Sequence, residues 1–89
     1  MLKVNFSKKS IHFLESLPEK QVKQLASKIK QLQENPNSLQ TKMLKGYSKF
    51  RRVASGEYRI VFHITDETLY IVLIGKRNDE DVYRQLERM

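Results

Sequence analysis

The chain of 89 residues has no cysteine, few glycines and no long apolar run. Without cysteine it has neither disulfides nor thiolate metal sites, which fits a reducing cytoplasm, and its stability must come from packing. The longest apolar runs, 69–74 and 60–62, are far too short to span a bilayer, and the N-terminus lacks a signal-peptide pattern. We therefore expect a single cytoplasmic domain, residues 1–89, that does not enter a membrane.

Acidic residues are scarce in the first two-thirds of the chain. Residues 1–60 hold 13 Lys and Arg against 4 Asp and Glu, the remainder holds 4 against 6, and residues 35–56 hold no acid. The formal net charge of the whole chain is +7. A field of this sign favours nucleic acid, an anionic membrane surface or an acidic protein as a partner. Charge alone does not distinguish these partners from a well-solvated basic surface without a ligand.

Motifs for metal or nucleotide chemistry are also missing. The two histidines, His12 and His63, are isolated, and no paired carboxylates or HExxH spacing accompany them. The glycines at 46, 56 and 75 are dispersed, so they form no phosphate-binding loop. We therefore expect no metal and no cofactor.

Hydrophobic periodicity predicts an α+β domain. Alternating apolar residues indicate strands, and apolar residues three and four apart indicate amphipathic helices. Ser7 is a candidate N-cap for the first helix, and Pro18 suits the first turn of the second. The expected order is an N-terminal strand over 2–6, helices over 8–17 and 18–34, strands over 48–54, 58–65 and 69–74, and a short C-terminal helix over 79–89.

The two helices should form a hairpin on one face of an antiparallel three-strand meander. That face should hold Tyr58, Ile60 and Phe62, and the first strand should pair at or beside the last. The run 69–74 is apolar at both parities, so it should be a central strand covered on both faces. The helix positions expected in the core are Ile11, Phe13, Leu14 and Leu17, followed by Val22, Leu25, Ala26, Ile29 and Leu32.

Two arginines should lie on neighbouring strands, off the helix-covered face. A tight turn at 55–56 makes the flanking strands antiparallel, so Arg52 and Arg59 can converge with Arg77. Guanidinium forks donate to two phosphate oxygens, and RNA carries its own nucleophile, the 2′-hydroxyl. A tyrosine such as Tyr83, or a lysine, could move the protons. These residues alone indicate either a metal-free RNase or an RNA-binding sheet.

Three segments carry a resemblance to a known family: 43–46, 56–62, and 74–77 followed by Val82 and Tyr83. In this order and spacing they resemble the RelE/ParE toxin superfamily, in particular the RelE-like mRNA interferases of toxin–antitoxin pairs. The resemblance covers nearly the whole chain and implies the RelE-like order β-α-α-β-β-β. It implies a metal-independent endoribonuclease that cuts mRNA in the ribosomal A site by 2′-hydroxyl attack and so inhibits translation.

The resemblance also implies roles for individual residues. Arg59 matches an arginine that binds phosphate and stabilises the transition state, and Arg77 matches one that stabilises charge or helps the leaving oxygen. Tyr83 matches a tyrosine that stacks on a base and takes part in proton transfer, and Arg52 matches a basic strand residue near the scissile phosphate. The chain departs from the family at Phe50, where the best-known members have a lysine proposed as proton acceptor.

Further basic residues are expected to bind RNA. Lys45 matches a basic residue of the family that contacts RNA, and Lys20, Lys23 and Lys49 are expected to meet the rRNA backbone. The implied partners are the ribosome, mRNA and an acidic, RelB-like antitoxin, with a toxin–antitoxin hetero-oligomer on operator DNA.

Other interpretations stay open at this point. The main alternative function is a ParE-like toxin that inhibits DNA gyrase without RNase activity, and another is an inactive RNA-binding or repressor protein. The four site side chains and His63 also have purely structural interpretations. These are ion pairs of Arg59 and Arg77, for instance with Glu57 or Asp79, a solvated Arg52, and packed or solvent-facing rings for Tyr83 and His63.

Overall fold

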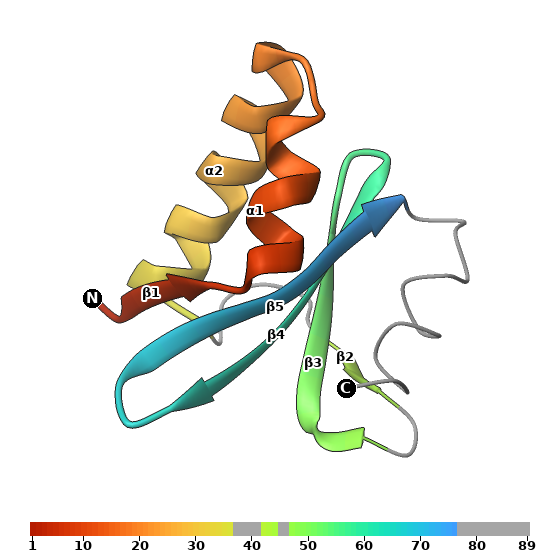
Figure 1. The fold of residues 1–89 in the computed structure, drawn as a ribbon. Helices are drawn as coiled ribbons and strands as arrows, with labels where there is room; N and C mark the ends of the chain where they lie inside the picture. Colours follow the sequence, from red (N-terminus) through yellow and green to blue (C-terminus); the bar gives the residue numbers. More distant parts are fainter. Residues whose placement is uncertain (37–41, 45–46, 77–89) are drawn as a thin grey trace.

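The computed structural model describes residues 1–36, 42–44 and 47–76, with only the backbone described for 42–44 and 47–49. The elements in chain order are β1 (Lys3–Phe6), α1 (Lys8–Glu15), α2 (Glu19–Glu34), β2 (Lys42–Leu44), β3 (Tyr47–Ser55), β4 (Tyr58–Thr65) and β5 (Thr68–Lys76) (Figure 1). The helix expected over 79–89 lies outside the described residues, as do Lys45, Arg77 and Tyr83. Neither described helix is long and apolar enough to cross a membrane.

The strands form one sheet in the order β1-β5-β4-β3-β2. β1 runs parallel to β5, and every other neighbouring pair is antiparallel. The α+β class, the meander and the place of the first strand beside the last are therefore confirmed. β2 was not expected, because three residues are too few to show an alternating pattern.

The two helices pack side by side against one face of the sheet (Figure 1). The predicted face is confirmed, since Tyr58, Ile60 and Phe62 are all buried beneath the helices. The ring of Phe13 from α1 meets Tyr58 edge-on, with a centroid separation of 5.9 Å. The buried core consists of Leu25, Ile29, Leu32, Val53, Tyr58, Ile60, Phe62, Leu69, Ile71 and Ile74.

Two helix positions expected in the core are instead exposed. Ile11 is 45% exposed, and its neighbour Ser10 is fully buried in its place. The Ser10 hydroxyl donates to the Ser7 carbonyl at 2.8 Å, which satisfies the polar group that is buried. Ala26 is exposed because the buried stripe of α2 follows Leu25 and Ile29, and Ala26 lies on its flank.

Ser7 joins β1 to α1 and ties the junction to β5. Its backbone N–H donates to Ile71 O at 2.9 Å, and its hydroxyl donates to Val72 O. The same oxygen accepts from the backbone N–H of Ser10 at 3.1 Å, which confirms Ser7 as the N-cap. These bonds fix the start of α1 against the centre of the sheet.

The doubly apolar run predicted a central strand, and β5 is an interior strand, second from the β1 edge. It lies between β1 and β4, and residues 69 and 71–75 are buried. A bulge at Val72 interrupts its pairing with β4, because Val61 pairs with Leu73 whereas Phe62 pairs with Ile71. Beyond the bulge Ile74 still faces the helices, and Leu73 and Gly75 face the other side.

The β4–β5 turn offers a test of backbone strain. Asp66 and Glu67 both have positive φ, 51° and 63°, as in a type I′ hairpin turn that favours Asn-Gly. Glu67→Gly should raise the free energy of unfolding by about 0.5–1 kcal/mol. It removes the steric strain of a side chain at positive φ, and this gain exceeds the loss from the greater conformational entropy of glycine in the unfolded chain. Urea denaturation would measure this. Glu57→Gly in the β3–β4 turn is the control and should be destabilising, because Glu57 has no positive φ.

Candidate active site

Arg52 and Arg59 lie on the sheet face opposite the helices. Arg52 pairs with Val61 across β3 and β4, and Arg59 pairs with Ala54. The intervening Val53 belongs to the core, and successive strand residues point to opposite faces. The predicted placement of the two arginines on one face is therefore confirmed.

The two arginines are close enough to contact a single phosphate group. They lie on neighbouring strands, offset by two residues, so that their Cα atoms are roughly 8 Å apart. Both side chains are half-buried. Two long guanidinium side chains at this spacing can donate to different oxygens of one phosphate.

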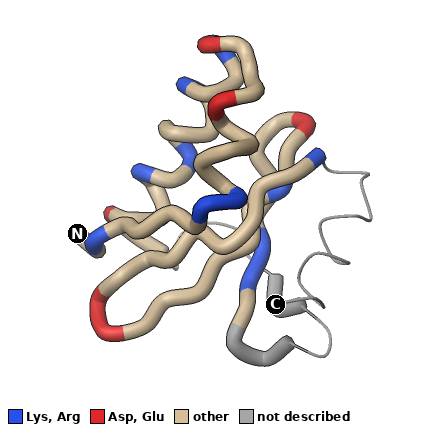
Figure 2. Tube along the Cα trace, viewed as in Figure 1, with Lys and Arg blue, Asp and Glu red and all other residues tan. Residues whose placement is uncertain are grey.

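The same face carries no acidic residue among the strand positions whose side chains the structure describes. In Figure 2 basic positions lie on β3, on the helices and at the end of β5, and acidic positions lie at turns and on the helices. The described residues on this face are Lys3, Asn5, Phe50, Arg52, Ala54, Arg59, Val61, His63, Thr65, Thr68, Tyr70, Leu73 and Gly75.

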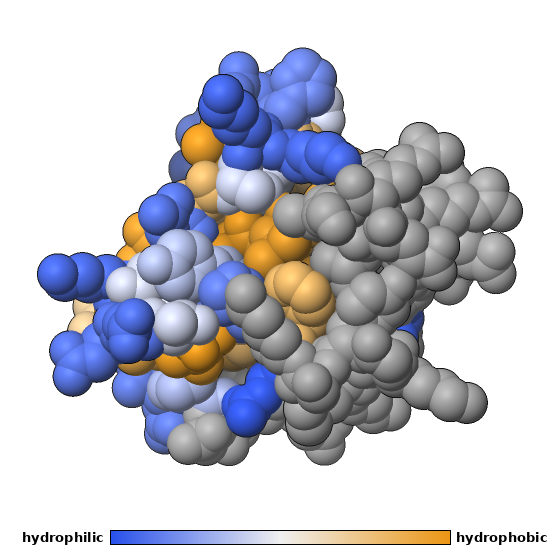
Figure 3. Space-filling view, turned by 60° about the horizontal axis from the view of Figure 1, so that its bottom comes forward, coloured by the Kyte–Doolittle hydropathy of each residue, from blue (hydrophilic) through white to orange (hydrophobic). Residues whose placement is uncertain are grey.

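A buried apolar floor accompanies the arginines. Val61 is 0% exposed and Leu73 is 2% exposed, although both point away from the helices. Both side chains therefore contribute almost nothing to the hydrophobic surface that Figure 3 shows from the lower side of the molecule. Charged hydrogen bonds formed beside buried apolar side chains are stronger than in bulk solvent.

Three aromatic rings form a row across the same face. The imidazole of His63 stacks on Tyr70, with centroids 4.7 Å apart and ring planes 18° apart. Phe50 meets the other side of His63 edge-on, at 5.7 Å and 70°. His63 Nδ1 also lies 3.1 Å from Thr65 Oγ1. The imidazole is therefore held in a defined orientation.

Sequence reasoning missed this row because it treated His63 as an isolated side chain. The signal was available in the two tight turns, which fix which residues lie opposite one another. Counting back from them places Phe50 opposite His63, and His63 opposite Tyr70.

The structure does not bring the expected RNA-binding lysines of α2 to the arginine face. Lys20 and Lys23 are exposed on a helix that covers the opposite side of the sheet. Lys23 Nζ lies 3.3 Å from Glu19 Oε1, and its side chain is 75% exposed. A contact between these lysines and rRNA stays a prediction, as does one by Lys49, of which only the backbone is described.

A hollow of about 680 Å³ lies elsewhere, between α1 and the end of β5. The described residues that line it include neither Arg52 nor Arg59; they are Lys8, Lys9, His12, Phe13, Ser16, Leu73 and Ile74. We place the site at the arginine face, because its two arginines lie close enough to donate to one phosphate of a nucleic-acid backbone. Within the described ranges no three His, Cys, Asp or Glu side chains gather as a metal-binding group.

Comparison with solved structures shows RelE toxins with the same fold. The isolated E. coli RelE toxin superposes with a TM-score of 0.75 at 18% identity, covering 99% of this chain and 97% of that chain. The RelE–RelB complex from Pyrococcus horikoshii gives 0.73 at 20% identity, covering 86% and 96%. The RelBE2 toxin–antitoxin complex from Mycobacterium tuberculosis gives 0.74 at 22% identity, covering 85% and 98%.

Sequence comparison identifies the family. No curated protein sequence matches the chain significantly. The family model described as the ParE toxin of the type II toxin–antitoxin system parDE matches residues 4–80, which extend from β1 to beyond the end of β5. The chain therefore belongs to the RelE/ParE family of type II toxin–antitoxin toxins.

Proposed function

We propose that this toxin is a metal-independent endoribonuclease that cleaves mRNA on the ribosome and so inhibits translation in the cytoplasm. The observation that carries the proposal is the placement of Arg52 and Arg59 on one sheet face, two strand positions apart on neighbouring strands. Two fixed guanidinium groups suit a phosphodiester whose negative charge increases during reaction.

In the proposed reaction the 2′-hydroxyl of the substrate attacks the adjacent phosphorus, and the bond to the 5′-oxygen of the next nucleotide breaks. The products are a cyclic phosphate and a 5′-hydroxyl. Arg59 and Arg52 donate hydrogen bonds to the phosphate oxygens, and these bonds strengthen as charge builds up in the transition state. A base removes the proton of the 2′-hydroxyl, and an acid protonates the leaving oxygen. Arg77 and Tyr83 are proposed for charge stabilisation and proton transfer.

The proposed physiological partner is an acidic, RelB-like antitoxin. Two of the structural relatives are toxin–antitoxin complexes, namely RelE–RelB and RelBE2. A chain of net charge +7 is complementary to an acidic partner, which would also compete with RNA for the same field. Such a pair could assemble further as a hetero-oligomer on operator DNA.

The decisive test adds the purified toxin to ribosomes programmed with a defined mRNA and maps the new 5′ ends. We expect cuts within the A-site codon and a 2′,3′-cyclic phosphate on the upstream product. Free mRNA should be cut far more slowly than mRNA on ribosomes. Because chelators also disrupt ribosomes, the control for metal independence exchanges Mg²⁺ for Ca²⁺ at constant concentration. Intact mRNA after prolonged incubation with active ribosomes would refute the proposed function.

Inhibition of DNA gyrase is the second candidate function, because the matching family model is described as a ParE toxin. A supercoiling assay with purified gyrase separates the two candidates. We expect the wild-type protein to leave supercoiling unchanged at concentrations that arrest translation in a cell-free system. Inhibition of supercoiling together with unimpaired translation would favour the gyrase function instead.

A further inference from the structure

The row of Phe50, His63 and Tyr70 lies directly beside the arginines. His63 follows Val61 by two residues on β4, and Val61 is the strand partner of Arg52. None of the three rings belongs to the buried core, and all three are half-buried. They are therefore surface aromatics next to a positively charged site, an arrangement that suits single-stranded nucleic acid.

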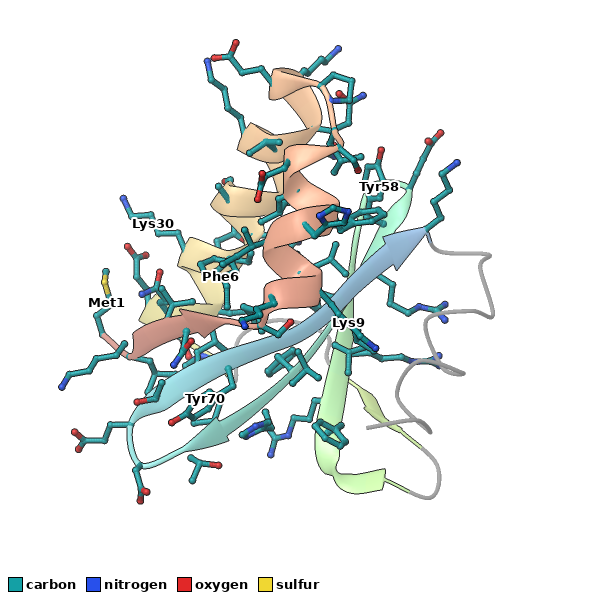
Figure 4. The ribbon with its side chains drawn as sticks, in the orientation of Figure 1. Met1, Phe6, Lys9, Lys30, Tyr58 and Tyr70 are labelled. Atoms are coloured by element: carbon teal, nitrogen blue, oxygen red, sulfur yellow. The ribbon has the colours of Figure 1, made fainter. Side chains whose placement is uncertain are left out.

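Tyr70 is the ring of this row best placed to receive a ligand. Figure 4 shows it below β5, on the side of the sheet away from the helices. His63 stacks on one of its two faces, and no aromatic ring among the described residues stacks on the other. Among the described residues, the Tyr70 hydroxyl has no hydrogen-bond partner. Stacking on the second face would therefore extend an ordered pile of rings.

We propose that Tyr70, supported by His63, is a stacking site for a base of single-stranded RNA. The proposal rests on the proposed function, because the neighbouring phosphate is taken to be the one bound by Arg52 and Arg59. It adds base recognition by a residue other than Tyr83. Rigidity is built in, since His63 is fixed by Tyr70, by Phe50 and by its contact with Thr65.

The distance between Arg52 and Tyr70 suits a base whose nucleotide is attached to the bound phosphate, or a base one nucleotide further along the RNA. Two strand residues span about 6.6 Å and neighbouring strands are about 4.8 Å apart. Tyr70 lies two strands across the sheet from Arg52, and it is displaced along the strands by two residues. The Cα atoms of Arg52 and Tyr70 are therefore roughly 12 Å apart. Arg52 and Tyr70 both extend from the same face, and a sugar with its base can bridge the remaining gap.

The test measures binding without relying on cleavage. The probe is a fluorescent single-stranded RNA hexamer with methylated 2′-hydroxyls, which removes the nucleophile, and a matched set in which each base in turn is removed. Tyr70→Leu should weaken binding of the intact hexamer about tenfold, the loss expected for one base–aromatic stack. Tyr70→Phe keeps the ring and should bind within about twofold of wild type. For the wild type, one abasic position should cause a similar loss.

Removal of that same base should not weaken binding to Tyr70→Leu any further, because the ring on which the base stacks is already missing. Tyr70→Leu should also leave the slope of log affinity against log salt unchanged, whereas Arg52→Ala should reduce its magnitude by about one. Lys30→Ala on α2 is the matched surface control and should not change the dependence on the base. Thermal unfolding checks that each variant is folded, and if Tyr70→Leu is not, the abasic series with the wild type still tests for a base-dependent contact.

Three results would overturn the stacking site. The first is that Tyr70→Leu binds the intact hexamer as tightly as wild type does. The second is that Tyr70→Leu loses the same affinity for the intact hexamer and for every abasic hexamer. The third is that the wild type binds all hexamers with the same affinity. Failure of the proposed function looks different. In that case the base-dependent loss persists with the hexamer set, but wild-type toxin leaves mRNA on programmed ribosomes uncut.

Discussion

Arg59→Ala should lower the rate of mRNA cleavage on programmed ribosomes by about 100-fold or more. The side chain extends from β4 beside a buried apolar floor, and its fork can donate to oxygens that gain charge only as the 2′-hydroxyl attacks. Loss of a donor that acts mainly in the transition state lowers the rate of the chemical step more than it weakens substrate binding.

The measurement is single-turnover cleavage at saturating toxin, with ribosome binding followed separately. Arg59→Lys retains the charge but loses the planar fork, so its rate should lie between those of Arg59→Ala and wild type. Lys30→Ala also removes one positive charge, from an exposed position on α2 that Figure 4 shows directed away from the sheet, and it should cleave normally. Equal rates for Arg59→Ala and Lys30→Ala would show that Arg59 has no part in the chemistry.

The placement of the arginine face could be derived from the sequence because two short turns determine the strand register. Residues 55 and 58 pair across one turn, and residues 65 and 68 pair across the other. Alternation along β3 and β4 then separates Arg52 and Arg59 from the apolar residues between them. The same counting would have revealed the row containing His63.

Other features could not be derived because they depend on tertiary contacts. Periodicity favours Ile11 over Ser10 as a core residue, yet Ser10 is buried because carbonyl oxygens of Ser7 and Ile71 can receive its hydroxyl. The bulge at Val72 cannot be recognised from the sequence pattern, because the strand is apolar on both faces and an extra residue does not change that pattern. Arg77 and Tyr83 follow β5, outside the described residues, and their part in the site stays a prediction.

Phe62→Ala should be the most damaging of the substitutions considered, lowering the free energy of unfolding by about 3–5 kcal/mol. Phe62 is 0% exposed and is the largest fully buried side chain among the described residues. It lies on β4 against the helices, and its strand partner Ile71 is also buried. A small domain has about 5–15 kcal/mol of stability in total, so this cavity would remove a large share of it.

Urea denaturation of Phe62→Ala and Ile64→Ala provides the comparison. Ile64 follows Phe62 on the same strand and face but is 36% exposed, so its truncation should cost about 1 kcal/mol or less. The site depends on this packing, because Val61 and His63 flank Phe62 and project toward the arginine face. Loosening Phe62 should therefore also reduce cleavage below the unfolding midpoint. Equal losses of stability in the two variants would mean that the helices do not cover β4 as described.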